Sequence, residues 1–389
     1  MSTGEHGSKG GSEGPFGAAL FRATLKGSPE DFTVHERLDI ALDGAGEHLW
    51  LHIEKRGLDT WAVRDALAQA FGCTERDVGH AGLKDRHAVT RQWLSVRSGA
   101  DPDADAAHIA ALVEALGEGE GERPGAPSLR VLHSARHGRK LRIGAHRGNT
   151  FRIVLRHLTD PAGNPLPGGA GGEAPAETLA AALQQRVEQL RALGCPNRIG
   201  EQRFGRGGGN LPAARALLGG TARQRQRLTR RRRGLLLSAA RSHLFNRVLD
   251  ARIQRGDWHT LLPGEPAMLH GSRSCFVPEP DDADLPERLA SLDVSPTGPL
   301  PGRGPSLARD ACARFEHEVL SDETALIDGL SEAGVEVGRR ALRVAVPDLT
   351  VEPRLDDGQV VFRFSLPPGS FATSLIELFG ATRVADDPS

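Results

Sequence analysis

Apolar and polar residues alternate in several short stretches of this chain, and a period of two is typical of half-buried strands. In the stretch after residue 47, the apolar residues Leu49, Leu51 and Ile53 fall on one face and polar residues fall between them. The same alternation recurs twice. The predicted strands are HLWLHIE at 48–54, GNTFRIVLR at 148–156 and VVFRF at 360–364.

Other stretches repeat their apolar residues at the spacing of a helix. DTWAVRDALAQAFG (59–72) predicts a helix with Asp59 or Thr60 as its N-cap. A second helix is predicted at 177–193, and the pattern of 210–255 is also helical. Near the C-terminus a Pro-Pro-Gly turn follows the last strand and leads into a short final helix. The elements therefore predict a mixed protein with strand-rich ends and a helix-rich middle.

Length and composition place the chain among globular proteins. Its 389 residues suggest two domains or one domain with a large insertion. Hydrophobic residues make up 39% and charged residues 25%, and no apolar run is long enough for a membrane span. The start lacks the apolar stretch of a secretory signal, so we expect a cytoplasmic protein. Three Gly-rich segments are expected to be unstructured, at 1–17, 117–127 and 161–177.

Charge is nearly balanced over the whole chain but not along it. The 49 basic and 50 acidic residues give a net charge of −1. TARQRQRLTRRRRG (221–234) nevertheless contains no acidic residue. The run is either a solvated helix face or a stripe that binds nucleic-acid phosphates, and the local imbalance favours the second reading. The predicted RNA-backbone residues are Arg223, Arg225, Arg227, Arg230, Arg231, Arg232 and Arg233.

The candidate chemistry lies in AGLKDRHAVTRQW (81–93), on a loop that enters a strand. Asp85 lies between Lys84 and Arg86, and flanking cations favour the charged form of a carboxylate. Such a group can serve as a nucleophile or a base. The alternative is a turn residue with an ordinary surface ion pair. No second carboxylate lies nearby, and no phosphate-binding loop, C-x-x-C pair or H-E-x-x-H motif is present.

Eight blocks, in order along nearly the whole chain, resemble the TruD family of tRNA pseudouridine synthases. AGLKDRHAVTRQW is similar to the family's AGxKDxxAVTxQW signature, which carries the catalytic aspartate. The other blocks are LKGSPEDFTVHE (25–36), GEHLWLHIEKRGLDT (46–60), RKLRIGAHRGNTF (139–151), NRIGEQRFG (197–205), AARSHLFNRVL (239–249), RRALR (339–343) and LPPGSFATS (366–374). Each block alone is weak evidence of the family. The resemblance is specific because all eight blocks occur in the family's order.

The resemblance implies an isomerase that converts uridine, at position 13 of certain tRNAs, to pseudouridine without cofactor or metal ion. The glycosidic bond moves from N1 to C5 of uracil, so the departing uracil must rotate and rejoin the ribose in one pocket. One carboxylate acts, either on the ribose or on the base. The remaining groups hold the flipped base and exclude water.

The resemblance also assigns residues of the site. Asp85 would be the catalytic carboxylate, and Lys26 would be the cation paired with it. Phe151 would stack on the target base, a role that tyrosine holds in many other pseudouridine synthases; this chain contains no tyrosine. The other residues implied to line the uridine pocket are Phe32, Asn149 and Phe371.

From the residues alone, each pocket position also has a structural reading. Phe32 and Phe371 are equally compatible with a place in the core. Asn149 follows a glycine and is compatible with a turn. Ile199 stands in NRIGEQRFG where the family usually has an aromatic residue.

The family implies an α+β fold: a pseudouridine synthase catalytic domain with a mixed, largely antiparallel sheet, and an inserted helix-rich α+β domain. We predict a disordered tail at 1–17, catalytic-domain segments at 18–195 and 339–389, and the inserted domain at 196–338. The expected partner is tRNA, and we expect a monomer that needs no protein partner and no membrane. The alternative function is a catalytically silent tRNA-binding protein or folding aid.

Overall fold

The chain is divided into two units in its computed structural model. The structure describes residues 14–99, 101–117, 126–166, 173–220, 228–279 and 281–385. Unit 1 comprises Met1–Leu20, Gln185–Val346 and Ser370–Gly380, and unit 2 comprises Phe21–Gln184, Pro347–Gly369 and Ala381–Ser389. The predicted inserted domain, 196–338, falls within the central segment of unit 1. The predicted domain boundaries remain predictions.

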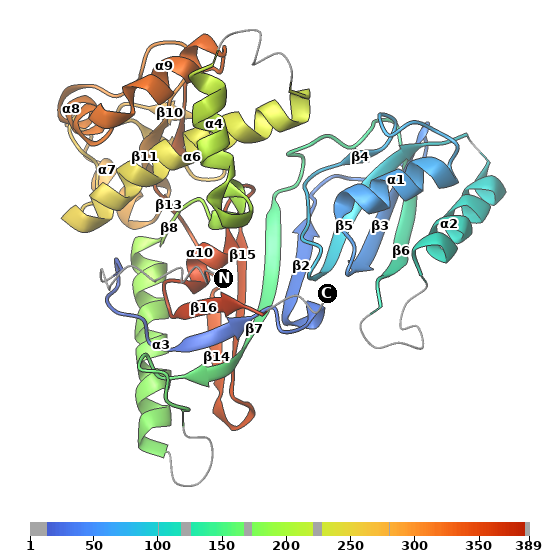
Figure 1. Ribbon diagram of the computed structural model, residues 1–389, viewed down its shortest axis with the longest axis horizontal. Coiled ribbons are helices and arrows are strands. Elements are labelled where there is room, and N and C mark those ends of the chain that lie inside the picture. Colours follow the sequence, from blue (N-terminus) through green and yellow to red (C-terminus); the bar gives the residue numbers. More distant parts are fainter. Residues whose placement is uncertain are drawn as a thin grey trace, which may run out of the picture. The chain divides into compact units, whose positions relative to one another are not determined.

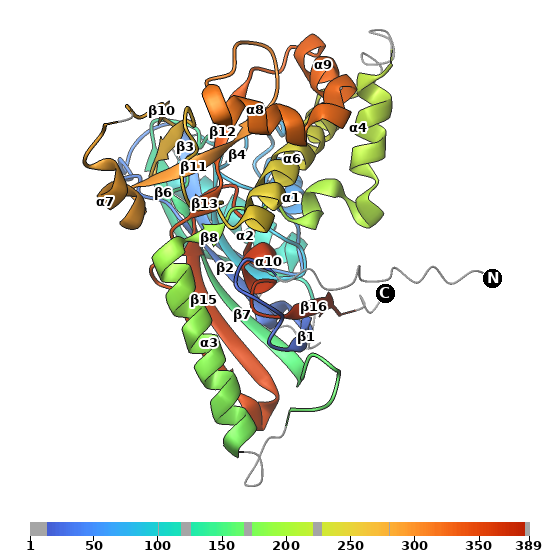
Figure 2. The same ribbon diagram turned by 90° about the vertical axis from the view of Figure 1, so that its left-hand side faces the viewer.

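Unit 2 is built on a single large sheet. Its elements are β1 (Arg22–Leu25), β2 (Phe32–Arg37), β3 (His48–Arg56), α1 (Thr60–Ala70), β4 (Gly79–His80), β5 (Val89–Arg97), α2 (Pro102–Leu116), β6 (Ser128–His137), β7 (Gly148–Thr159), β14 (Thr350–Arg354), β15 (Gln359–Leu366) and β16 (Ala381–Val384). Helix α3 (Glu173–Leu193) begins in unit 2 and ends in unit 1, and its first part runs alongside β15 in Figure 2.

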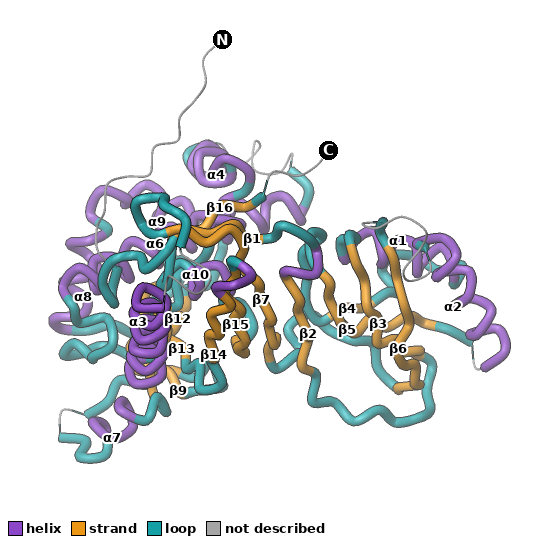
Figure 3. Tube along the Cα trace, turned by 90° about the horizontal axis from the view of Figure 1, so that it is seen from below, coloured by secondary structure: helices purple, strands orange, loops and turns teal. Residues whose placement is uncertain are grey.

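The strands of this sheet run in the order β14-β15-β7-β2-β5-β3-β6, with β1, β16 and β4 attached beside this path. Most neighbouring strands are antiparallel, whereas β2 pairs with β5 and β1 with β16 in parallel. Figure 3 follows the row β2, β5, β3 and β6. The sheet is therefore mixed and largely antiparallel, as the sequence predicted.

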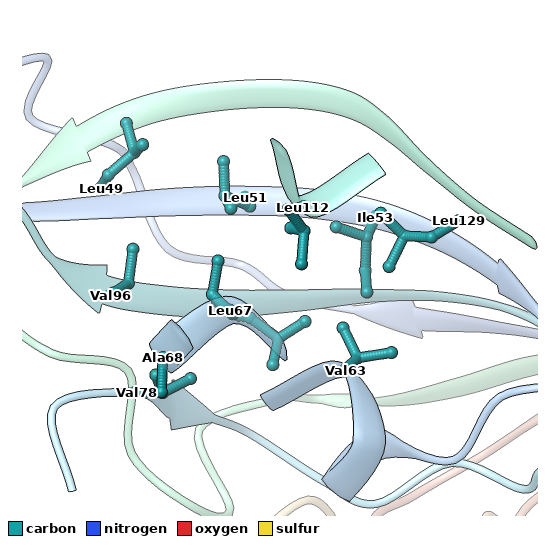
Figure 4. Packing of buried hydrophobic residues seen from close by; sticks show 11 residues of the cluster. Leu49, Leu51, Ile53, Val63, Leu67, Ala68, Val78, Val96, Leu112 and Leu129 are labelled. Carbon is teal, nitrogen blue, oxygen red and sulfur yellow. The ribbon is translucent and has the colours of Figure 1, made fainter. Parts of the chain in front are cut away.

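One face of the sheet is covered in part by α1 and α2, which lie on the same side of β3, β5 and β6 in Figure 1. The alternation in β3 turns its leucines and isoleucine toward these helices, and Figure 4 shows the resulting cluster. Each such side chain, once buried, contributes roughly 1.5–3 kcal/mol. The buried members are Leu49, Leu51, Ile53, Val63, Leu67, Ala68, Val78, Leu94, Val96, Leu112 and Leu129.

The same face continues past the helices over β2, β7 and β15. Register partners run across the sheet from Phe364 of β15 through Phe151 of β7, Val34 of β2 and Thr90 of β5 to Lys55 of β3. Residues opposite one another on paired strands project to the same side. We call this side, which carries both the apolar cluster and this row, the site face.

Unit 1 contains most of the helices. Its elements are β8 (Cys195–Pro196), α4 (Asn210–Leu218), α6 (Arg230–Arg255), β9 (Ala267–Leu269), β10 (Cys275–Phe276), α7 (Leu285–Ala290), β11 (Val294–Leu300), α8 (Asp310–Val319), α9 (Thr324–Glu332), β12 (Gly338–Ala341), β13 (Arg343–Val344) and α10 (Ala372–Ile376). Figure 1 shows α6 lying against β11. Leu236, Ala240, Leu244 and Val248 recur every four residues and turn one face of α6 into the core.

The predicted elements with the clearest periods are confirmed. Helix α1 begins after Asp59, whose Oδ1 accepts a hydrogen bond from the amide of Ala62 at 2.8 Å. The strands predicted at 48–54 and 148–156 are β3 and β7, each slightly longer. Within the described residues, no helix is long and apolar enough to cross a membrane.

Candidate active site

The carboxylate singled out in the sequence is held by a distant lysine. Asp85 lies on the loop between β4 and β5, and its Oδ2 accepts a hydrogen bond from Lys26 Nζ at 2.8 Å. The side chain of Asp85 is 41% exposed and that of Lys26 is 12% exposed. The carboxylate is therefore accessible to a ligand while its counter-ion is nearly buried.

Hydrogen bonds to β3 and α1 anchor the loop that carries Asp85. Lys55, which is fully buried, donates from Nζ to the backbone oxygen of Asp85 at 2.9 Å and also to the carbonyl of Leu58. Burial lowers the pKa of Lys55 from 10.5 to about 8, and the charge of Asp85 opposes that shift. The amide of Lys84 donates to Thr60 Oγ1 at 2.9 Å. Two elements, β3 and α1, thus fix the backbone on either side of the carboxylate.

The sequence argument that Lys84 supports the charge of Asp85 is wrong. Lys84 Nζ donates instead to Glu36 Oε2 at 2.5 Å, in an ion pair whose side chains are 4% and 0% exposed. Glu36 Oε1 also accepts from the amide of Trp93 at 3.1 Å. Neighbouring side chains on an extended segment point in opposite directions, so adjacency in sequence did not bring Lys84 to Asp85.

Lys26 has an unusual backbone for a lysine. Its φ is +59°, a left-handed conformation that costs a residue with a Cβ roughly 1–2 kcal/mol. Its Nζ also lies 4.4 Å from the ring centroid of Phe32. The chain accepts this strain at the position where the ammonium meets both Asp85 and an aromatic ring.

Three phenylalanines continue the site face beside Lys26. The rings of Phe32 and Phe151 meet edge to face with centroids 6.2 Å apart, and Phe151 stacks on Phe364 at 5.2 Å. Phe151 is 7% exposed and Phe32 is 3% exposed. The structure therefore brings these two predicted pocket residues together, and both also belong to the core of unit 2.

Asn149 lies two residues before Phe151 in β7, on the same face. Its Oδ1 is buried and has no hydrogen-bond partner among the described residues. A buried acceptor without a donor is costly, so this amide needs an explanation that the fold alone does not give. The preceding Gly148 allows close pairing, because a Cβ there would lie 2.5 Å from the carbonyl oxygen of Leu366.

The last predicted pocket residue, Phe371, belongs to unit 1. It is half-buried and precedes α10, where Gly200 lets the backbone approach the ring: a Cβ at 200 would lie 3.1 Å from Phe371 Cδ1. Ile199, the departure from the family pattern, is 6% exposed and packs in the adjacent apolar cluster. Asn246 holds the amide and carbonyl of Ile199 with two 2.9 Å hydrogen bonds. Ile199 is a core residue in this chain.

The described part of the arginine run forms the start of α6. Arg230, Arg231 and Arg232 are exposed, and Thr229 caps the helix by accepting from the amide of Arg232 at 3.2 Å. Cations at this positive end of the helix dipole are unfavourable, so helix stability does not explain them. Arg233 donates to the carbonyl of Ala333 at 3.0 Å. The other predicted members, Arg223, Arg225 and Arg227, lie outside the described residues.

Sequence reasoning missed the two buried charges beneath Asp85. Lys55 continues the apolar series of β3 at the next position of the same face, and Glu36 continues the series Phe32, Val34 in β2. A charged residue in phase with a buried apolar face was the available signal, because such a residue must find a partner inside the fold. Within the described ranges, no cluster of three or more histidine, cysteine or carboxylate side chains could hold a metal ion.

Comparison with known proteins gives consistent likenesses. A family model described as tRNA pseudouridine synthase D (TruD) matches residues 19–224 and 219–379. The tRNA pseudouridine synthase D of Pseudomonas syringae pv. tomato is 44% identical over 364 residues, covering 93% of this chain and 92% of the relative. That of Methylococcus capsulatus is 40% identical over 362 residues, covering 92% and 91%.

The architecture also has a match among solved structures. The crystal structure of a putative tRNA pseudouridine synthase D (TruD) from Methanosarcina mazei superimposes with a TM-score of 0.68, at 20% identity and with 95% of each chain covered. At this identity the likeness concerns the fold. It confirms the predicted α+β class.

Proposed function

Because this chain belongs to the tRNA pseudouridine synthase D (TruD) family, we propose that it isomerises uridine 13 of tRNA, with Asp85 as the catalytic carboxylate and Lys26 as its paired cation. The family's reaction is the isomerisation of uridine in tRNA. The assignment to Asp85 is supported by one observation: a half-exposed carboxylate held at 2.8 Å by a nearly buried lysine, on a loop anchored by Lys55. Position 13 is what the family resemblance implies.

The ion pair suits a carboxylate that must act without a second acid or base. Lys26 orients one oxygen of Asp85, which leaves Oδ1 for the reacting nucleoside. Lys55 fixes the backbone of the same residue. Both contacts exist before substrate binds, so little reorganisation is needed at the moment of reaction.

The aromatic residues and Asn149 supply a place for the flipped base. Phe151, with Phe32 edge to face beside it, takes the stacking role that the resemblance implies, because an aromatic ring stabilises an unstacked base. The Oδ1 of Asn149 matches the N3–H donor of uracil, which would satisfy the acceptor. Phe371 stays a proposed pocket residue on the family resemblance alone.

The chemistry follows from these positions. The bond between N1 of uracil and C1′ of ribose breaks, while Asp85 acts on the ribose or on the base. The uracil rotates without leaving the pocket, C5 bonds to C1′, the hydrogen on C5 leaves as a proton, and N1 takes up a proton. One proton leaves C5 and one joins N1, so no oxidant or reductant is needed, and the residues other than Asp85 need only bind, orient and exclude water.

The arginine run is the proposed contact to the RNA backbone. Arg230, Arg231 and Arg232 gather positive charge at an exposed helix start where it does not stabilise the helix. Replacing all four arginines of 230–233 by glutamine should weaken tRNA binding and reduce its salt dependence. An unchanged affinity and salt slope would contradict this assignment.

The function is tested with tRNA transcripts labelled with tritium at C5 of uridine. Formation of the C5 glycosidic bond releases that tritium to water, so the protein should release one tritium per modified uridine. A transcript with cytidine at position 13 is the matched control and should release none. Tight tRNA binding without any release would favour the silent binding protein instead, and equal release from both transcripts would refute the assigned position.

A further inference from the structure

Arg203 of unit 1 has a partly buried guanidinium that pairs with no carboxylate among the described residues. It lies in the short 3₁₀ turn Glu201–Phe204, and its Nε is buried and has no hydrogen-bond partner. Burial lowers the pKa of Arg203, and no carboxylate among the described residues opposes that shift. A partly buried charge of this kind is stabilised by an anion or by a set of acceptors.

A second arginine lies near enough to repel it. Burial, and then the charge of Arg203, lower the pKa of Arg340 to about 10. Arg340 donates to both the carbonyl and the Oδ1 of Asn197.

The surroundings of Arg203 match one nucleotide of an RNA chain. Its guanidinium carbon lies 5.9 Å from the ring centroid of Phe371. Ser370 Oγ, next to that ring, donates to Asn197 Oδ1 at 3.0 Å. A ring, a hydroxyl and two guanidinium groups are the groups that hold the base, sugar and phosphate of a single-stranded nucleotide.

The same residue connects to the arginines at the start of α6. The Nδ2 of Asn210 donates to the carbonyl of Arg203 at 3.1 Å, and its Oδ1 accepts from Arg232 Nη1 at 3.1 Å. Asn210 is 7% exposed, so its amide is fixed between the two. The turn that carries Arg203 and the arginine-rich helix start are therefore neighbours within unit 1.

We propose that Arg203 binds a backbone phosphate of the RNA substrate, beside Phe371 and continuous with the arginines of α6. This site rests on the proposed function for its ligand, an RNA phosphodiester. The Nε of Arg343 and of Arg241 is also buried without a partner in the described part of the chain, but their terminal nitrogens find acceptors: those of Arg343 donate to the carbonyls of Leu193 and Leu289 at 3.0 and 2.6 Å. No comparable set of acceptors surrounds the guanidinium of Arg203 among the described residues.

The test compares Arg203→Gln with the matched control Arg241→Gln. Arg241 is a partly buried arginine of the same unit that donates to the carbonyls of Leu300 and Glu336. Affinity for tRNA is measured against potassium chloride concentration. Loss of one phosphate contact to a single strand should reduce the slope of log K against log salt by about 0.7 and weaken binding roughly fivefold at 0.1 M salt. The control should keep the wild-type slope.

Thermal unfolding separates binding from structure. Inorganic phosphate, compared with chloride at equal ionic strength, should raise the melting temperature of the wild type more than that of Arg203→Gln. Without phosphate, Arg203→Gln should melt no lower than the wild type, because it removes a repulsive charge beside Arg340. Arg241→Gln should melt lower.

Two results would overturn the proposal: a wild-type salt slope in Arg203→Gln, or a fall in its melting temperature as large as that of the control. Tritium release by the wild type is measured on the same preparations. Absence of release would count against the proposed function alone, because the phosphate and salt responses of Arg203 do not depend on catalysis.

Discussion

The lysine that pairs with Asp85 offers a test in which stability and activity should separate. Lys26 combines a φ of +59° with an ion pair at 2.8 Å. Lys26→Ala and Lys26→Gly remove the same ammonium group and differ only in the Cβ. The alanine keeps the strain of the left-handed backbone, whereas the glycine relieves it.

The magnitudes follow from the geometry. Two unit charges 2.8 Å apart attract by about 1.5 kcal/mol even at the dielectric constant of water. The 41% exposure of Asp85 argues for this lower limit, and 1.5 kcal/mol corresponds to roughly a tenfold loss of rate. Relief of the left-handed strain should make Lys26→Gly about 1 kcal/mol more stable than Lys26→Ala.

The assays are single-turnover tritium release and urea denaturation of both variants beside the wild type. We expect both variants to lose activity at least tenfold and to the same extent, while their unfolding free energies differ by about 1 kcal/mol in favour of glycine. Recovery of activity in the more stable glycine variant would refute the reasoning, because activity would then follow the backbone and not the charge. Full activity in both would show that the ion pair is not used.

Three further results are expected. Glu36→Gln should lower the unfolding free energy by about 3–5 kcal/mol, since it leaves Lys84 charged and buried. The double variant that also carries Lys84→Met should recover part of that loss. If urea denaturation showed that the effects of the two substitutions simply add, the pairing would be contradicted. Folding lowers the pKa of Lys55 to about 8. The buried ammonium therefore destabilises the folded state fully below pH 8, and this destabilisation disappears as pH rises toward 10.5. Relative to Lys55→Met, the unfolding free energy of the wild type should rise by about 1.4 kcal/mol per pH unit between pH 8 and 10.5. A difference between the two proteins that does not change with pH would contradict the lowered pKa. Gly148→Ala places a Cβ 2.5 Å from the carbonyl oxygen of Leu366 and should lower the unfolding free energy by about 1–3 kcal/mol. Tritium release at saturating tRNA should also fall. A variant with the melting temperature and activity of the wild type would exclude the close approach.

Local patterns predicted the elements whose periods are regular. The alternation of Leu49, Leu51 and Ile53 defines β3 because one face of that strand packs against helices. Helix α2 was not predicted, since its many alanines and its aspartates give little contrast between faces. The short strand β16 was also missed, because a four-residue strand carries too few residues to show a period.

The site could be predicted only in part for a different reason. Lys26 and Asp85 are 59 residues apart, and no local pattern reports a contact between distant segments. The family resemblance supplied that pair, whereas the residues alone suggested Lys84, which the fold turns toward Glu36. Asn149 looked like a turn residue by its glycine neighbour, yet it lies within a strand whose register places it on the site face.

The most direct test of the account is tritium release by Asp85→Asn. The amide keeps the size and shape of the side chain and can still meet Lys26, so folding and tRNA affinity should match those of the wild type. We expect release from C5-labelled tRNA to be abolished while the wild type turns over. Release at the wild-type rate from the folded, tRNA-bound variant would contradict the claim that this carboxylate performs the reaction.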